Sequence, residues 1–352
     1  MSATVGDFIL QRLHEWGVRR IFGYPGDGIN GLMGALGRAA DRFEYVRVRH
    51  EEMSAFMAGA HAKFTGEVGV CMATSGPGAL HLLTGLYDAK MDHVPVVAIV
   101  GQQALASLGS DYQQEVDLQA VFQDLGDYVQ TIVSPAQARH VIDRAMRIAA
   151  AERTVTCVIV PNDIQLQKAV PSPPRSHGNN YSSVGHAIPH PAPTDEELSH
   201  AAGVLNAGRR VAVLVGAGGL RATDELIQVC ETLGAGAAKA LLGKAALPDD
   251  LPWVTGSIGL LGSKPSWELM QECDTLLMVG TTFPYAEFLP RDGQARAVQI
   301  ERRLSKAEIL DLYLNLAPYG GNLEGIRSAS LAYFGKEPRR LSVAESALLV
   351  AL

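Results

Sequence analysis

Residues 45–66 read YVRVRHEEMSAFMAGAHAKFTG. The alternation in YVRVR is typical of a short strand, and the small and apolar residues from Met53 onward predict a buried helix. Glu51 and Glu52 stand at the step between the two. Ligands of open parallel sheets bind beyond the carboxyl ends of the strands, which is where Glu51 would lie. The stretch therefore predicts a strand–helix unit of an α/β fold with a carboxylate at its ligand-binding edge.

Similar units fill the rest of the first 165 or so residues. Strands that are apolar on both sides alternate with helices, which predicts a buried parallel sheet. We expect helices at 4–16, 28–40, 52–64, 78–90, 115–124 and 135–151, and strands at RRIFGYP, YVRVR, VGVCMAT, PVVAIVG and TCVIVPN.

The remainder of the chain divides by composition. Residues 169–194 are rich in Pro, Ser, Gly and His and read as a linker. Residues 195–300 again alternate strands and helices, and 301–352 form a strongly amphipathic helical pattern. We therefore expect two doubly wound parallel-sheet domains, 1–168 and 195–300, followed by a helical tail.

Composition excludes several classes of function. The chain has 352 residues, of which 47% are hydrophobic and 19% charged, and this is typical of globular domains with real cores. A net charge of -7 without a Lys/Arg run argues against a nucleic-acid partner. No apolar run is long enough to predict an integral membrane span, and no signal peptide is recognisable. Four scattered cysteines predict free thiols in a reducing compartment, so we expect a cytoplasmic protein.

Two glycine turns are candidate ligand sites. Gly26, Gly28 and Gly31 in YPGDGINGLMGAL make a formal GxGxxG, which predicts either a dinucleotide site or an ordinary tight turn. Gly76-Pro77-Gly78 closes a strand and opens a helix, so it brings backbone close to a ligand or simply turns the chain.

Glu51 also has two interpretations. A carboxyl group against the small and apolar residues that follow it would be desolvated, which favours its protonated form. The alternative is that Glu51 and Glu52 only stabilise the positive end of a helix. His81 and His93 are expected to be surface or helix-packing residues.

Several motifs in this order resemble the pyrimidine-binding domain of thiamine-diphosphate-dependent 2-oxo acid enzymes, in the pyruvate oxidase and acetolactate synthase branch. The resemblance covers residues 1–165 and rests on VRHEE, TSGPGALHLLTGLYDA, DHVPVVAIVGQ and DLQAVFQD. Residues 195–300 resemble the Rossmann-like central, flavin-binding domain of the same family. The segments that carry this second resemblance are VLVGAGG, LLGKAALP, SIGLLG and VGTTFPYAEFLP.

The resemblance assigns roles to individual residues. It implies that Glu51 shares a proton with N1′ of the cofactor's aminopyrimidine, and that Phe122 and Gln123 lie near the reacting centre. Other implied contacts to the thiamine cofactor or substrate are Gly26, Asp27, Gly28, Gly76, Pro77 and Gly78. Implied FAD contacts are Gly216, Gly218, Gly243, Lys244, Thr282 and Phe283.

Two departures from the family limit these expectations. The third domain, which in the family holds the diphosphate through Mg²⁺, is not recognisable, so no metal ligand is assigned to this chain. Residues 301–352 instead resemble the glycosyltransferase domain of class A penicillin-binding proteins, closest to the one-C type, through KAEILDLYLN and YFGK. Glu308 matches the second active-site glutamate there, while the first is absent, so we expect no transferase activity.

The sequence thus predicts a truncated or chimeric enzyme of pyruvate oxidase type, which decarboxylates pyruvate or a similar 2-oxo acid and passes electrons to FAD. The resemblance implies homodimers or homotetramers in the parent family, and we expect the chain alone to be inactive. Three alternatives stay open: an acetolactate synthase-like carboligase, a non-catalytic flavin- or nucleotide-binding module, and a peptidoglycan glycosyltransferase fragment.

Overall fold

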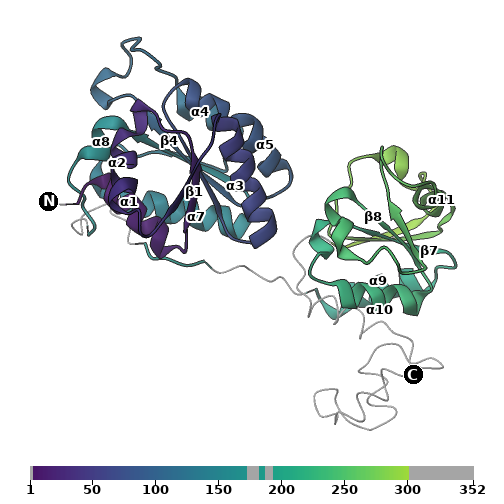
Figure 1. Ribbon diagram of the computed structural model, residues 1–352. Helices are drawn as coiled ribbons and strands as arrows, with labels where there is room; N and C mark the ends of the chain where they lie inside the picture. The colour runs from purple at the N-terminus through teal and green to yellow at the C-terminus, as the bar shows by residue number, and fades with distance from the viewer. Residues whose placement is uncertain (1–2, 173–181, 187–192, 301–352) are drawn as a thin grey trace, which may run out of the picture. The chain divides into compact units, whose positions relative to one another are not determined.

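A computed structural model of the protein describes residues 3–172, 182–186 and 193–300. The chain divides into two compact units, Met1–Pro189 and His190–Leu352 (Figure 1). The predicted helical tail, 301–352, lies outside the described residues. Among the residues that are described, no helix is both long enough and apolar enough to cross a membrane.

The first unit is built on a six-stranded sheet in the order β2-β1-β3-β4-β6-β5, with every neighbouring pair parallel. Its strands are β1 (Arg20–Gly23), β2 (Glu44–Arg47), β3 (Gly69–Ala73), β4 (Val96–Gln102), β5 (Tyr128–Thr131) and β6 (Val155–Pro161). Its helices are α1 (Val5–Glu15), α2 (Asn30–Arg38), α3 (Glu51–Thr65), α4 (Pro77–His81), α5 (Leu83–Met91), α6 (Leu118–Phe122), α7 (Ala138–Glu152) and α8 (Asn162–Leu166). The predicted buried parallel sheet is confirmed.

Apolar clusters lie on both faces of this sheet. Strands β3, β4 and β6 are buried along their whole length. Residues of α1, α2 and α7 pack with Val70 and Met72 on one face, and residues of α3 and α5 pack with Cys71 and Ala73 on the other (Figure 1). Alternate residues of one strand thus point into opposite cores, which is why β3 reads as a continuous apolar run.

Helix α3 starts and stops at defined signals. His50 is its N-cap and accepts a hydrogen bond from the Glu52 N–H, and Gly66 ends it with φ of 77°, in the left-handed region that favours glycine. Small residues let α3 approach α5 closely, since a Cβ at Gly85 would lie 2.7 Å from the backbone nitrogen of Phe56. This packing fixes the first turn of α3, and with it Glu51, against the sheet.

The second unit is a five-stranded parallel sheet in the order β11-β10-β7-β8-β9. Its strands are β7 (Val211–Val215), β8 (Gly236–Lys239), β9 (Val254–Ser257), β10 (Thr275–Val279) and β11 (Arg296–Ile300), and its helices are α9 (Asp195–Asn206), α10 (Thr223–Leu233) and α11 (Lys264–Glu272). The predicted second α/β domain is confirmed. The sequence patterns did not predict β5, β9 or α9.

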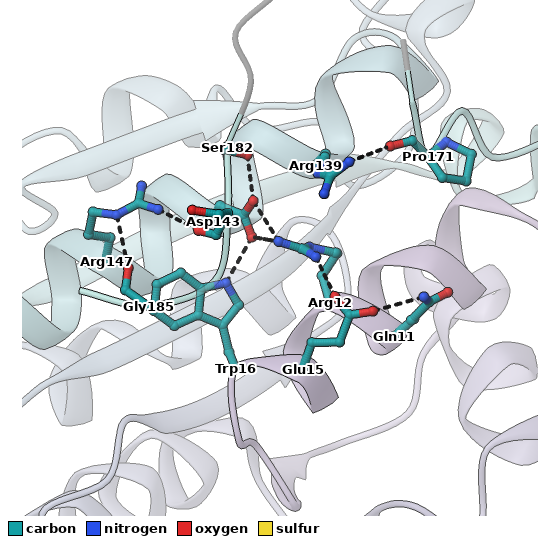
Figure 2. A network of polar contacts seen from close by, with 11 residues as sticks. Gln11, Arg12, Glu15, Trp16, Arg139, Asp143, Arg147, Pro171, Ser182 and Gly185 are labelled. Atoms are coloured by element: carbon teal, nitrogen blue, oxygen red, sulfur yellow. Dashed lines mark hydrogen bonds and ion pairs between the residues drawn. The ribbon is translucent and has the colours of Figure 1, made fainter.

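Part of the predicted linker lies against the first unit. Asp143, on α7, is fully buried and accepts hydrogen bonds from Arg12 of α1, from Trp16 at the C-cap of α1 and from the Ser182 hydroxyl (Figure 2). Arg147 donates to the carbonyl oxygen of Gly185 at 3.2 Å. Residues 182–186 are therefore held on α1 and α7 by polar contacts.

Candidate active site

The Glu51 carboxylate lies at the ligand-binding edge of the first sheet. It opens α3 directly after β2 and is only 8% exposed. Its Oε2 is 3.0 Å from Nδ1 of His81. Its Oε1 faces Gly78, where a Cβ atom would lie 3.2 Å from it. That Cβ atom would also lie 2.5 Å from Thr74 Cγ2, so glycine at this position lets the start of α4 pack against the Glu51 carboxylate.

His81 is a site residue that sequence reasoning missed. It is the last residue of α4, its side chain is 45% exposed, and its ring lies 4.3 Å from that of His50. The sequence analysis expected His81 to be a surface or helix-packing residue. Its exposure agrees with that expectation, but its contact with Glu51 was not predicted. Its place after the Gly76-Pro77-Gly78 turn could have drawn attention, but only the fold brings α4 beside α3.

The two glycine turns of the first unit meet each other. A Cβ at Gly26 would lie 2.5 Å from Thr74 Cβ, and one at Gly28 would lie 2.5 Å from Ser75 Oγ. The Gly28 N–H donates to Thr74 Oγ1 at 2.9 Å and to the Asp27 carboxylate. Glycine at both positions is thus explained by the close approach of the second turn.

The third glycine of the formal GxGxxG is packed in the same way. A Cβ at Gly31 would lie 2.5 Å from the Cβ of Gln165. Because all three glycines contact protein groups, the tight-turn interpretation accounts for them without a dinucleotide.

Gln114 is a second residue that the sequence did not single out. It lies over the second turn, where its carbonyl oxygen would be 2.5 Å from a Cβ at Gly76. Gly76 has φ of 56° and Gln114 has φ of 61°, so the backbone is left-handed on both sides of this contact. The Gln114 Oε1 is buried and has no hydrogen-bond partner among the described residues. An unpaired buried acceptor beside the turn makes Gln114 a candidate for the site.

Phe122 and Gln123 lie elsewhere in the same unit. Phe122 ends α6 and is fully buried in the apolar cluster that contains Ala55 and Ala58 of α3, so core packing accounts for its ring. Gln123 is exposed at the C-cap of the same helix. A role for Phe122 and Gln123 near a reacting centre stays a prediction.

Tyr45, on β2, is a further polar group near Glu51. Burial raises the pKa of Tyr45 to about 12, with the positive charge of Arg47 opposing the shift and the negative charge of Glu51 adding to it. Its hydroxyl is buried and unpaired among the described residues. The Tyr45 phenol therefore stays neutral near the Glu51 carboxylate, and its O–H remains available to donate a hydrogen bond.

In the second unit, the predicted flavin residues gather at the carboxyl ends of the central strands. A Cβ at Gly243 would lie 2.5 Å from the Val215 carbonyl oxygen and 2.7 Å from Gly216, and a Cβ at Gly280 would lie 2.3 Å from Gly218 Cα. Lys244 and Thr282 are exposed, whereas Phe283 is buried with φ of 24°. The structure thus brings the three glycines together at the edge where α/β sheets bind ligands, with Thr282 and Phe283 just beyond β10.

The two units and the buried carboxylate at the strand–helix step define an α/β cofactor-binding protein. Family models identify its parts: residues 3–121 match the N-terminal TPP binding domain of thiamine pyrophosphate enzymes, and residues 198–310 match their central domain. Residues 293–352 match the transglycosylase family. The chain therefore belongs to the thiamine pyrophosphate enzyme family and carries a transglycosylase-like segment at 293–352.

Curated relatives agree with this assignment. The chain is 36% identical over 292 residues to the putative thiamine pyrophosphate-containing protein YdaP of Bacillus subtilis, covering 83% of this chain and 50% of the relative. It is 37% identical over 312 residues to an uncharacterized 42.6 kDa protein of Pseudomonas amyloderamosa, covering 88% and 77%. It is 36% identical over 286 residues to the pyruvate oxidase of Lactiplantibacillus plantarum, covering 81% and 47%. The chain thus spans about half the length of the first and third of these relatives.

The Glu308 prediction falls outside the described residues. The transglycosylase match includes that position, and strand β11 at Arg296–Ile300 lies inside both the transglycosylase and the central-domain matches.

Proposed function

We propose that this chain supplies the pyrimidine-binding half of a thiamine diphosphate site that acts on a 2-oxo acid such as pyruvate. The observation that carries the proposal is the buried Glu51 carboxylate, held by His81 at the carboxyl end of a parallel sheet and next to the backbone of Gly78. A glutamate there is placed to share a proton with a ring nitrogen.

The residues around Glu51 fit an aminopyrimidine. Gly78 presents only backbone to Oε1 of this carboxylate, because a Cβ there would lie 3.2 Å from that oxygen and 2.5 Å from Thr74 Cγ2. Burial of Glu51 excludes most water, so a proton held at its carboxyl is exchanged with a bound ring in preference to solvent. The His81 contact at Oε2 fixes the orientation of the carboxylate. Thiamine diphosphate, when bound, supplies the electron sink for decarboxylation of the 2-oxo acid.

The pyruvate oxidase type of reaction is the version we favour. It is supported by the similarity to a pyruvate oxidase and by the glycine-lined edge of the second unit, where Gly216, Gly218 and Gly243 would approach FAD. Electrons from the 2-oxo acid would pass to that flavin. Mg²⁺ would be held with the diphosphate by a further domain, because the one group of potential metal ligands among the described residues contains two histidines, which do not suit Mg²⁺.

The proposal implies that the site is completed by another polypeptide surface. A domain that binds the diphosphate, in the same polypeptide or in another subunit of a homodimer or homotetramer, would provide it. We therefore expect no steady-state turnover of pyruvate by this chain alone with thiamine diphosphate and Mg²⁺.

Calorimetric titration with thiamine diphosphate tests the assignment of Glu51. We expect measurable binding by the unaltered chain, loss of binding in Glu51→Gln, and no change in the neighbouring control Glu52→Gln. Equal affinity of the unaltered chain and Glu51→Gln would refute the assigned role.

An acetolactate synthase-like carboligase is the second candidate, because the chain is also 33% identical over 286 residues to the acetolactate synthase of Mycobacterium avium. In a complex that restores turnover, the products separate the two: bleaching of the flavin band by pyruvate supports the oxidase, and acetolactate without bleaching supports the carboligase. A colourless purified protein would argue against FAD binding altogether. The glycosyltransferase alternative requires lipid II polymerisation, for which Glu308 would be the residue to test.

A further inference from the structure

His50, Glu51 and His81 form a cluster of potential metal ligands at the mouth of the candidate site. One ligand atom from each residue lies within 4.8 Å of the other two. The part of the chain that the structure describes contains no other group of three such side chains. The cluster joins the first turn of α3 to the last residue of α4, so it exists only in the folded unit.

The spacing of these atoms is close to that of a zinc site. Tetrahedral Zn²⁺ with bonds of about 2.0–2.1 Å holds its ligand atoms about 3.3 Å apart. His81 Nδ1 and Glu51 Oε2 are already 3.0 Å apart. The side chains of His50 and His81 are 49% and 45% exposed, so both can turn by the small amount that the third ligand requires.

A metal ion could replace the hydrogen bonds that these side chains make in the structure. His50 would give up the long 3.3 Å N-cap hydrogen bond that it accepts from the Glu52 N–H and the 3.9 Å contact of its Nδ1 with the Glu52 carboxylate. A metal ion between His81 Nδ1 and Glu51 Oε2 takes the place of the hydrogen bond that joins them, and His81 then binds it as the tautomer that carries its proton on Nε2.

We propose that the cluster of His50, Glu51 and His81 binds Zn²⁺, or a divalent metal of similar preference, when no thiamine cofactor is present. Two imidazoles and one carboxylate select Zn²⁺, Cu²⁺ or Ni²⁺ over Mg²⁺, which prefers oxygen ligands. The bound metal occupies the Glu51 carboxylate and so excludes a pyrimidine ring from it. The metal site does not depend on the proposed function, whereas the exclusion of thiamine diphosphate does.

Titration of the metal-free chain with Zn²⁺ against a chromogenic chelator tests the proposal. We expect the affinity to fall by at least about tenfold in His50→Ala and in His81→Ala. The matched control is His61→Ala, because His61 also contacts a carboxylate, Glu67 at 3.1 Å, but belongs to no group of three. Circular dichroism checks that each variant folds, and the exposed His50 makes His50→Ala decisive if His81→Ala unfolds.

Two results would overturn the site. One is unchanged Zn²⁺ affinity in folded His50→Ala, and the other is an equal loss in His61→Ala. A second titration measures the affinity for thiamine diphosphate with and without Zn²⁺, and it tests only whether the metal excludes the cofactor. If Zn²⁺ binds through the cluster but leaves thiamine diphosphate binding unchanged, the metal site stands and the placement of the pyrimidine at Glu51 is wrong.

Discussion

The Asp143 carboxylate is fully buried 2.6 Å from Arg12 Nη2, and the pair joins α7 to α1 across one face of the first sheet (Figure 2). Arg12 also donates through Nε, and Trp16 Nε1 donates to the same carboxylate oxygen at 2.8 Å. This carboxylate therefore has the partners that a buried charge requires, and it also receives the Ser182 hydroxyl.

Removal of this carboxylate should strongly destabilise the first unit. In Asp143→Ala the Arg12 guanidinium loses its buried partner and keeps only the ion pair with the more exposed Glu15, so we expect a cost of up to about 3–5 kcal/mol. The control is Glu44→Ala, whose ion pair with Arg20 is exposed and worth about 0–1 kcal/mol. Urea unfolding followed by far-UV circular dichroism gives both values, and equal losses in the two variants would contradict the argument.

The Gly76 turn should tolerate no side chain. Gly76→Ala combines a left-handed φ with a Cβ only 2.5 Å from the Gln114 carbonyl oxygen, so strain and clash add. Gly109→Ala isolates the first effect, because Gly109 has φ of 88° but no atom within 4 Å of its added Cβ. We expect a loss of about 1 kcal/mol in Gly109→Ala and a larger loss in Gly76→Ala, measured by thermal unfolding. Similar melting temperatures would show that the Gln114 backbone moves freely.

The cysteines should be unreactive in the folded protein. All four are buried. Burial raises the pKa of Cys71 and of Cys230 to about 12 and that of Cys273 to about 11, so little thiolate is present at neutral pH. We expect no rapid reaction with a thiol reagent at pH 8 and four reacting thiols in denaturant. Fast labelling of the native chain would contradict the burial of these groups.

The sequence predicts an element of the fold where its hydrophobic pattern alone identifies it. Strands such as VGVCMAT are recognised because burial on both faces leaves a continuous apolar run. Strand β9, VTGS, is half-buried and contains Gly256 at φ of 106°, so no periodicity identifies it. Glu51 was found because a carboxylate between a strand and an apolar helix is unusual. His81 and Gln114 were missed because only tertiary packing brings them to Glu51 and Gly76.

Acid should weaken the second unit through Asp249. A hydrogen bond from the buried Lys239 ammonium holds the pKa of the Asp249 carboxyl below its usual value of 3.8. A carboxyl with a lowered folded-state pKa contributes stability that is present above its unfolded pKa and is lost as pH falls through the folded one. We expect the urea midpoint to drop as the pH falls below about 4, and to drop less in Asp249→Asn.

The chain offers a way to observe that unit by itself. In a Trp16→Phe background the remaining tryptophans, Trp253 and Trp267, both lie in the second unit, so their fluorescence reports its unfolding. Some acid sensitivity should persist in Asp249→Asn, because hydrogen bonds from Thr194 also lower the pKa of Glu197. An identical pH dependence with and without Asp249 would contradict the contribution of the Lys239 pair.

Gly78 offers the most direct test of the space beside Glu51. A methyl group at this position would lie 3.2 Å from Glu51 Oε1 and 2.5 Å from Thr74 Cγ2, so it would displace the groups that fix this carboxylate in the proposed pyrimidine site. We expect Gly78→Ala to weaken thiamine diphosphate binding at least about tenfold, the effect of roughly 1.4 kcal/mol. Gly37→Ala, a helical position of the same unit with no atom within 4 Å, should bind as the unaltered chain does. If calorimetry gives the same affinity for Gly78→Ala and Gly37→Ala in folded protein, the cofactor does not enter through this side of the carboxylate.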